Sequence, residues 1–371
     1  MNSIFSDKFT NKTRGVNLGS WLVLEKWMVP SLFNNLKAID ETSFCVELGK
    51  HAESLLRQHW NSFITEVDFE WLASIGINAV RIPIGHWIFG SDYPYHQAYG
   101  SNRYPYVVGG IDILDNAFIW AEKHNLMITI DLHAAPGCQN GFDNGGIQDV
   151  CEWHTKADYL SHSLNILENL AKRYHVSPAL QAIEVLNEPR WDIDTEVLKK
   201  YYTEAYSRIR QYCQPEHVAV VFHDGFRSFQ NYSGFMTEPS FRNVIIDIHR
   251  YQCFDQKDIE LNIYGHIKKT IDEWQNEADA IFENRGHQAW VGEWSLGLDL
   301  HPVPLWNRST QHKQDQFQMT TCYRAYAATQ LAVFEKYAGW FFWSYKTETN
   351  PAWCFKESIK RGWLPDNFSA V

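Results

Sequence analysis

The stretch LQAIEVLNEP, residues 180–189, is almost continuously apolar until it ends on Asn187, Glu188 and Pro189. An apolar run of this length, without polar alternation, is typical of a strand covered on both faces, as in a parallel sheet. The stretch therefore predicts a buried parallel strand whose last residues are polar.

Seven further stretches have the same character, and segments such as ILDNAFIWAEKHN, with apolar residues at three- and four-residue spacing, separate them. Parallel strands need crossover helices, and eight strands allow the last to close on the first. We therefore predict an α/β fold consisting of one (β/α)8 TIM barrel over residues 1–371. The seven stretches are RGVNLG (14–19), INAVRIPI (77–84), LMITIDLH (126–133), HVAVVFHD (217–224), NVIIDIHRY (243–251), QAWVGEWS (288–295) and GWFFWSYKTE (339–348).

A doubly wound sheet is the alternative to the barrel. That fold usually carries a glycine-rich phosphate loop after its first strand. Here the first predicted strand is followed by SWLVLEKWMVPSLF, which contains no glycine. The pattern therefore favours the barrel.

The composition indicates a neutral partner. The formal net charge is −11 and no Lys/Arg-rich block occurs, so nucleic acid and anionic membranes are poor partners. Aromatic residues make up 15% of the chain, including 16 Trp, which favours either a thick aromatic core or a cleft that stacks on sugar rings.

Targeting and redox signals are weak. The start of the chain lacks a signal-peptide pattern, and no apolar run is long enough to span a bilayer, so we expect a cytoplasmic protein, or an extracellular one if a leader was removed. The seven Cys are scattered without a CxxC pair, which predicts reduced thiols rather than a zinc site or a disulfide framework. The oligomeric state stays open.

Polar or ionisable residues end most of the predicted strands. In a barrel, the carboxyl ends of the strands converge on one face, where active sites are built. We therefore expect these side chains to form one site. They are Arg81, His133, Asn187, Glu188, His223, His249, Tyr251, Glu293 and Trp343 with Glu348.

Glu188 and Glu293 end the fourth and seventh predicted strands. Two carboxylates across a barrel mouth can cleave a glycosidic bond, since one protonates the leaving oxygen while the other attacks the anomeric carbon or activates water. Their separation decides between retention and inversion, and the sequence leaves that choice open. We expect repulsion between the two to raise the pKa of one of them, so that Glu188 spends part of the cycle protonated. This chemistry needs no cofactor.

A metal site is the alternative use of the same face. His133, His223, His249 and the two glutamates are ligand types for a divalent ion. No HxH or HxxxH spacing supports this alternative. We therefore predict no metal.

The ordered motifs resemble glycoside hydrolase family 5, a family of (β/α)8 retaining glycosidases. The resemblance rests on RIPI, DLH, LNEP and GEW in that order, and it covers residues 14–353. The stretches HAAPGCQNGFDNGG, DIHRYQCF and FFWSYKTETNPAW are similar to the exo-β-1,3-glucanase group in particular.

The resemblance implies Glu188 as general acid/base and Glu293 as nucleophile. It places Glu25 at the blind end of an exo-acting pocket, although this loop position also suits a surface carboxylate. Phe142 and Phe254 would clamp the next sugar, with Asn144 beside them; the alternative for each Phe is an ordinary core aromatic. The shell around the first sugar would consist of Arg81, His133, Asn187, His249, Tyr251 and Trp343.

The expected activity is that of a retaining exo-acting β-glucosidase or exo-β-1,3-glucanase, with a β-glucan oligosaccharide or β-glucoside as substrate. One alternative is a β-glucosidase for aryl, diglycoside or lipid glycosides. The tyrosine-rich loop at residues 93–106 would serve it by recognising an aglycone, or would simply be a packed surface loop. A catalytically inactive carbohydrate-binding barrel is the alternative from another class.

Overall fold

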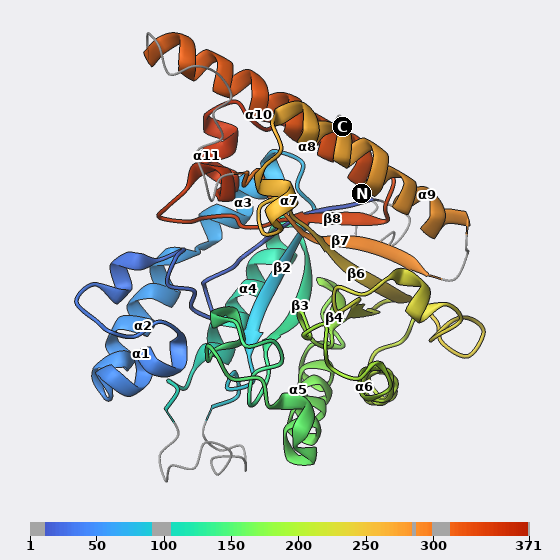
Figure 1. The fold of residues 1–371 in the computed structure, drawn as a ribbon. Helices are drawn as coiled ribbons and strands as arrows, with labels where there is room; N and C mark the ends of the chain where they lie inside the picture. The colour runs from blue at the N-terminus through green and yellow to red at the C-terminus, as the bar shows by residue number, and fades with distance from the viewer. Residues whose placement is uncertain (1–11, 91–104, 284–286, 299–311, 370–371) are drawn as a thin grey trace.

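Eight parallel strands form a closed barrel in which each strand pairs with its sequence neighbour and β8 pairs with β1. The computed structural model describes residues 12–90, 105–283, 287–298 and 312–369. Figure 1 shows the strands at the centre, with helices arranged around them. The barrel prediction is therefore confirmed. The strands are β1 (Thr13–Asn17), β2 (Ala79–Gly85), β3 (Met127–Ala134), β4 (Leu180–Glu184), β5 (Ala219–His223), β6 (Val244–Arg250), β7 (Gln288–Trp294) and β8 (Gly339–Phe342).

The helices pack their apolar faces on the outside of the barrel. In α5 (Ala157–Tyr174), for example, Ile166, Leu167 and Leu170 are buried, as the helical spacing predicts. The long α10 (His312–Phe334) lies beside α8 (Ile263–Lys269) (Figure 1). The other helices are α1 (Glu41–Leu48), α2 (His51–Phe63), α3 (Glu66–Ser74), α4 (Gly110–His124), α6 (Thr195–Ile209), α7 (Gln256–Ile259), α8 (Ile263–Lys269), α9 (Asn276–Glu283), α10 (His312–Phe334) and α11 (Phe355–Lys360), and a π-helical turn, Thr270–Gln275, joins α8 to α9.

The connection between β1 and β2 is longer than one crossover helix. It contains α1, α2 and α3, and Asp40 begins α1 by accepting a hydrogen bond from the backbone N–H of Ser43. Ahead of α1, Leu22 pairs with Ile84 and Glu25 pairs with Asp40 in isolated bridges. These bridges fold the segment after β1 over the carboxyl end of β2.

The interior of the barrel changes from apolar to charged over two residues of some strands, such as β4 and β6. Side chains two apart lie on the same face of a strand. Ala182 therefore precedes Glu184 on the inner face of β4, and Ile245 precedes Asp247 on that of β6. The apolar layer closes the lower end of the barrel and leaves the charged layer at the carboxyl ends. It consists of Ala79, Met127, Ala182, Ala219, Val221, Ile245, Trp290 and Phe341.

Six strands end earlier than predicted, and β4 and β8 do so by more than two residues. β4 ends at Glu184, so Asn187 and Glu188 lie just beyond the strand, and β8 ends at Phe342, one residue before Trp343. Asn187 still donates its backbone N–H to Leu132 O at 3.0 Å, which keeps it beside β3. The face on which the predicted site residues meet is therefore built from the first residues after the strands as well as from the strands.

Among the described residues, every helix is too short or too polar to serve as a membrane span. All seven cysteines are free thiols, five of them buried. Residues 91–104, which include Tyr93, Tyr95, Tyr99 and Tyr104, lie outside the described residues. Tyr106 is buried and stacks on Trp87 with ring centroids 4.0 Å apart, so this end of the predicted loop is packed.

Candidate active site

Glu188 lies at the carboxyl end of β4 with both carboxylate oxygens occupied. Oε1 lies 2.6 Å from His249 Nδ1, and Oε2 accepts a hydrogen bond from Asn144 Nδ2 at 3.1 Å. The backbone of Glu188 adopts φ = 41°, in the left-handed region. A non-glycine residue there costs about 1 to 3 kcal/mol, and such strain occurs at functional sites. The turn is what carries the Glu188 side chain off the strand and toward His249.

Glu293 lies on β7 and faces the same space. Arg81 Nη1 donates to its Oε1 at 3.0 Å, and the Tyr251 hydroxyl donates to its Oε2 at 2.8 Å. One donor on each oxygen is the arrangement that holds an ionised carboxylate in a fixed orientation. The side chain is almost fully buried, so bulk water does not compete for these bonds.

His249, on β6, connects the two glutamates. Its Nδ1 atom is 2.6 Å from Glu188 Oε1 and 3.4 Å from Glu293 Oε2. These two carboxylate oxygens are therefore no farther apart than the sum of the two distances. Inverting glycosidases need about 6.5 to 9.5 Å between their carboxyl groups, to admit a water molecule. The geometry is closer to the retaining arrangement.

The charges of this cluster differ from our expectation for Glu188. Burial alone would raise the pKa of Glu188, but the neighbouring His249 and the hydrogen bond from Asn144 hold that pKa below its usual value. Burial, opposed by His249 and reinforced by the charge of Glu188, raises the pKa of Glu293 instead. Repulsion thus raises the pKa of one glutamate of the pair, as expected, but that glutamate is Glu293, because His249 lowers the pKa of Glu188.

Arg81, on β2, is buried and organises the rest of the charged layer. It donates to Asn187 Oδ1 at 2.8 Å and to Asn17 Oδ1 at 2.9 Å. It also pairs with Glu184 at 2.7 Å and with Asp131 at 3.1 Å. Burial alone would lower the pKa of Arg81, but these carboxylates raise it well above its usual value, so the guanidinium stays charged.

His133 and Trp343 form one wall of the site. Their rings stack with centroids 5.3 Å apart and planes inclined by 7°. His133 Nδ1 lies 2.6 Å from Asp131 Oδ2, while its Nε2 is buried and has no hydrogen-bond partner among the described residues. A flat wall with one free ring nitrogen is suited to a sugar, because the indole face packs on C–H groups and the nitrogen meets a hydroxyl.

Glu25 is buried inside the site, so the surface alternative for it was wrong. Its Oε2 accepts a hydrogen bond from Trp27 Nε1 at 2.9 Å. Burial and then the charge of Asp143 raise its pKa well above the usual value, with smaller contributions from Glu293 and Glu188. Burial also raises the pKa of Asp143. Two carboxyl groups therefore lie near the Glu188–Glu293 pair, close enough for their charges to interact.

Exposed aromatic side chains follow four successive strands at the entrance. Phe142, Trp191, Phe226 and Phe254 are 38%, 59%, 43% and 66% exposed, which excludes the core alternative for the two Phe residues named from sequence. The Phe142 ring lies 6.5 Å from Trp191. Trp353 packs behind Phe254, with centroids 6.2 Å apart.

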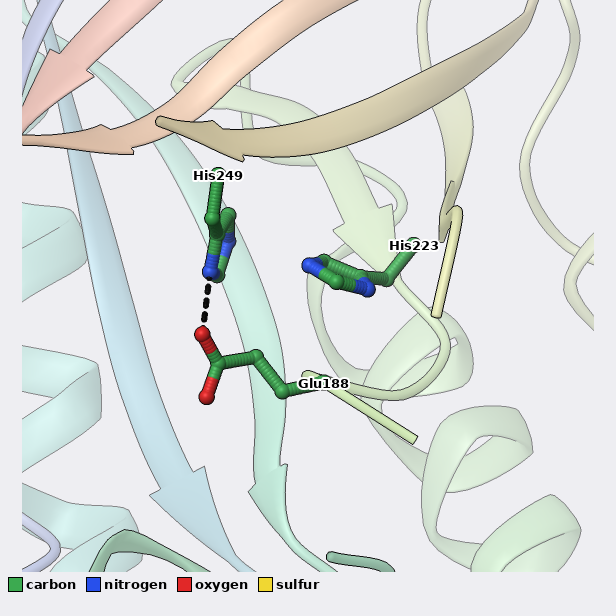
Figure 2. A group of neighbouring side chains, drawn as sticks. All are labelled: Glu188, His223 and His249. Carbon is green, nitrogen blue, oxygen red and sulfur yellow. Dashed lines mark hydrogen bonds and ion pairs between the residues drawn. The ribbon is translucent and has the colours of Figure 1, made fainter. Parts of the chain in front are cut away.

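Two groups of side chains have ligand types and spacing for a metal: Glu188 with His223 and His249, and Glu184 with Asp247 and His249. In Figure 2, His223 points toward the Glu188–His249 pair. His223 Nδ1 accepts a hydrogen bond from the Gly225 backbone N–H at 2.8 Å, so in the neutral ring the hydrogen is on Nε2. Burial, with the charges of His249 and Arg81, lowers the pKa of His223 well below its usual value. Its Nε2–H is a donor, which does not fit a metal ligand.

The residues of the second group, Glu184, Asp247 and His249, already interact with Arg81 or with one another. Arg81 pairs with Glu184, and His249 Nε2 lies 3.2 Å from Asp247 Oδ2. A guanidinium at this position already supplies the positive charge that a cation would bring. The residues therefore form a hydrogen-bonded charge network rather than a metal centre.

The site residues named from sequence thus lie on one face, except that Glu348 is exposed and accepts hydrogen bonds from Ser31 instead; the sequence reasoning missed several of their partners. Asp131 and Asp247 each stand two residues before a site histidine, in DLH and DIH, so the period of a strand could have revealed them. Asp143 lies between Phe142 and Asn144. Asn17, Glu184, Trp27, Trp191, Phe226 and Trp353 carry no comparable signal.

Comparison with known proteins assigns the chain to a class. A family model described as "Cellulase (glycosyl hydrolase family 5)" matches residues 44–349. A "Glucan 1,3-beta-glucosidase" of Blumeria graminis is 34% identical over 95% of this chain and 87% of its own. A protein of the same name from Candida oleophila is 35% identical over 97% of this chain and 90% of its own.

Solved structures share the fold at lower identity. The rutinosidase from Aspergillus niger superposes with a TM-score of 0.77 at 21% identity, covering 96% of this chain and 99% of its own. Cel5A of Thermotoga maritima, in complex with cellobiose, gives a TM-score of 0.58 at 15% identity, covering 97% and 99%. Each supports the barrel architecture.

Proposed function

This chain belongs to glycoside hydrolase family 5 and is a glycoside hydrolase acting on carbohydrate; on that premise, we propose that it is a retaining, exo-acting β-glucosidase of the exo-β-1,3-glucanase type. The observation that carries this proposal is the arrangement of Glu188 and Glu293 on either side of His249 Nδ1. The curated relatives are named glucan 1,3-β-glucosidases, which supports the choice of linkage.

The reaction takes two steps. In the first, Glu293 attacks the anomeric carbon while a proton passes from Glu188 to the glycosidic oxygen, and a glucosyl–Glu293 ester forms as the leaving group departs. In the second, Glu188 removes a proton from water, and the resulting hydroxide breaks the ester. Arg81 and Tyr251, the donors to the Glu293 oxygens, hold the attacking carboxylate in line.

Buried carboxyl groups beside the catalytic pair support exo action. Glu25 is buried and hydrogen-bonded to Trp27, and the charges of Asp143, Glu293 and Glu188 act on it. Such carboxyl groups can accept hydrogen bonds from the hydroxyls of a terminal sugar. The entrance carries Phe142 and Phe254, whose exposed rings suit the sugar that leaves.

The alternative of an aryl, diglycoside or lipid glycoside substrate draws on the same entrance. Trp191 and Phe226 extend the aromatic surface beyond the two Phe residues, and a flat aglycone stacks on such rings as readily as a sugar does. Family membership makes the chain a glycoside hydrolase, which contradicts the alternative of a catalytically inactive carbohydrate-binding barrel.

A substrate panel tests the proposal. We expect turnover of laminaribiose to exceed that of sophorose, gentiobiose and cellobiose, with glucose released as the β-anomer in the first NMR spectra. A mechanism-based 2-fluoroglucoside should label Glu293. Release of α-glucose would contradict retention, and preference for an aryl or lipid glucoside over every disaccharide would favour the alternative.

A further inference from the structure

Asp247, on the inner face of β6, contacts both catalytic halves of the site without reaching the substrate. Its Oδ1 accepts a hydrogen bond from the Gly292 backbone N–H at 2.6 Å, and Gly292 immediately precedes Glu293. Its Oδ2 lies 3.2 Å from Nε2 of His249, the partner of Glu188. The Asp247 side chain is almost fully buried.

Gly292 is required for this approach. A Cβ atom at residue 292 would lie 2.1 Å from both oxygens of the Asp247 carboxylate. No side chain fits at that distance, so the glycine lets the carboxylate reach the backbone of β7. Asp247 is therefore held in one place by the strand that carries Glu293.

This contact fixes the hydrogen on His249. An ionised carboxylate only accepts hydrogen bonds, so His249 Nε2 must carry a hydrogen and donate it to Asp247. Nδ1 is then the remaining nitrogen, 2.6 Å from Glu188 Oε1. One hydrogen occupies this short contact, either on Nδ1 as imidazolium and carboxylate or on Oε1 as imidazole and carboxylic acid. The two forms contain the same number of protons.

We propose that Asp247 is a positioning residue that locks His249 in the Nε2–H form, so that His249 and Glu188 together store the proton consumed in the first step. The proposal rests on the proposed function of Glu188 as acid and base.

The proton balance then follows through the cycle. In the first step the stored proton goes to the glycosidic oxygen, whose bond to the anomeric carbon breaks as the bond to Glu293 forms. His249 is left neutral, with a bare Nδ1 lone pair facing the Glu188 carboxylate. That carboxylate has lost the donor to its Oε1 atom, although Asn144 still donates to Oε2, and it is therefore more basic than before. In the second step it takes a proton from water, and the pair is restored.

The surrounding charges agree with this storage. Burial alone would lower the pKa of His249, but Glu293, Asp247 and Glu188 together raise it well above its usual value. The depressed pKa of Glu188 and the raised pKa of His249 thus describe one proton placed on the nitrogen. Other titratable groups face the pair: His223 on β5, Arg81 on β2, Glu184 on β4, His133 on β3, Tyr251 after β6 and, through Arg81, Asp131 on β3.

Asp247→Asn tests the proposal in the full-length enzyme. The amide keeps its oxygen on the Gly292 N–H and turns its NH2 group toward His249, which then needs a bare Nε2 and carries its hydrogen on Nδ1. This Nδ1–H donates to the Glu188 carboxylate, which then has no stored proton to give, so Glu188 becomes a poor acid. We expect kcat/KM to fall about 100-fold for the disaccharide that the wild type hydrolyses best, because general acid catalysis of this size is lost.

The leaving group separates this role from a merely structural one. A 2,4-dinitrophenyl β-glucoside departs without protonation, so its kcat/KM should fall far less than that of the disaccharide. The alkaline limb of the disaccharide kcat/KM profile should also move to lower pH, because removing the Asp247 charge weakens proton binding by the pair. Equal losses on both substrates with an unmoved limb would overturn the proposal.

Asp68→Asn is a matched control. Asp68 is a buried acid on α3 that accepts hydrogen bonds from the Tyr345 hydroxyl and Lys346 Nζ, each at 2.7 Å. Its loss should lower stability and leave the dependence on leaving group and pH unchanged. A wild type inactive on every glucoside would contradict the proposed function instead. If the Asp247 variant does not fold, 15N-histidine NMR of the wild type decides, with the His249 signals assigned by their loss in His249→Gln: a hydrogen on Nε2 supports the proposal, and a bare Nε2 overturns it.

Discussion

Two Asp-x-His pairs lie on the inner faces of β3 and β6. Their spacing is identical, but the aspartate contacts a different ring nitrogen of the histidine in each pair. Asp131 contacts the Nδ1 atom of His133, whereas Asp247 contacts the Nε2 atom of His249. The nitrogen left over therefore differs. In His133 it is Nε2, buried without a partner among the described residues, and in His249 it is Nδ1, bound to Glu188.

The difference shows how one local pattern produces two functions. Each aspartate fixes a hydrogen on one ring nitrogen and thereby decides what the other nitrogen can do. His133 stacks on Trp343 and keeps its free nitrogen for a substrate hydroxyl. His249 directs its free nitrogen at a catalytic carboxylate. In the proposed mechanism the first pair binds the sugar and the second moves a proton, and mutations should separate these two functions.

Glu293→Gln is the most severe test, because both pairs are proposed to serve a covalent step at Glu293. An amide does not attack the anomeric carbon, so we expect kcat to fall by about 10⁴-fold or more while circular dichroism shows an intact fold. The surface variant Glu357→Gln on α11 is the control and should keep wild-type activity. Near-normal turnover by the Glu293 variant would contradict a covalent step at Glu293, and with it the proposed functions of the two Asp–His pairs.

Asp131→Asn tests the binding pair. Asp131 orients His133 and pairs with Arg81 at 3.1 Å, so we expect a misplaced sugar and a loss of about tenfold in kcat/KM. This loss should be the same for the disaccharide and the dinitrophenyl glucoside, measured side by side with the Asp247 variant. If Asp131→Asn spares the activated substrate as Asp247→Asn should, the two pairs do not differ as described.

Phe142→Ala tests whether the two Asp–His pairs act on the first sugar alone, while Phe142 contacts the second. Phe142 lies at the entrance, so its loss should raise KM for the disaccharide about three- to tenfold through lost ring stacking. Methyl β-glucoside, which lacks a second ring, should keep its KM. Ile119→Ala on α4, another exposed apolar side chain, serves as the control. Equal effects on both substrates would place Phe142 at the first sugar instead.

Glu41 is a buried acid, and the variant Glu41→Gln replaces it with a group that is neutral at every pH. Burial, opposed by a hydrogen bond from the Leu24 backbone N–H, raises the pKa of Glu41 to about 8. Between about pH 4.5 and pH 8 the folded chain therefore keeps a proton that the unfolded chain releases, so this group's contribution to stability falls as pH rises.

Urea unfolding across this range measures the effect. Wild-type stability relative to Glu41→Gln should decline by about 4 to 5 kcal/mol from the lower to the upper pH, while activity at neutral pH is unchanged. Parallel stability curves for the two proteins would show that Glu41 is ionised in the folded state.

The barrel was predictable from sequence because eight buried strands leave continuous apolar runs, and the glutamates because they follow two of these runs. The use of each ring nitrogen was not predictable. His249 pairs with Glu293 across β6 and β7 only after a register shift between Ile248 and His249, and no sequence pattern reports such a shift. The depressed pKa of Glu188 has the same origin, since it depends on where that shift places His249.

The contact of Asp247 with Gly292 ties two distant positions into one evolutionary unit. A side chain gained at residue 292 displaces the acid, and an acid lost at residue 247 removes the reason for the glycine. Neither position can drift alone without disturbing the tautomer of His249. Engineers who redesign substrate choice should therefore leave this pair intact and change the exposed aromatic side chains after β3 to β6, which are Phe142, Trp191, Phe226 and Phe254.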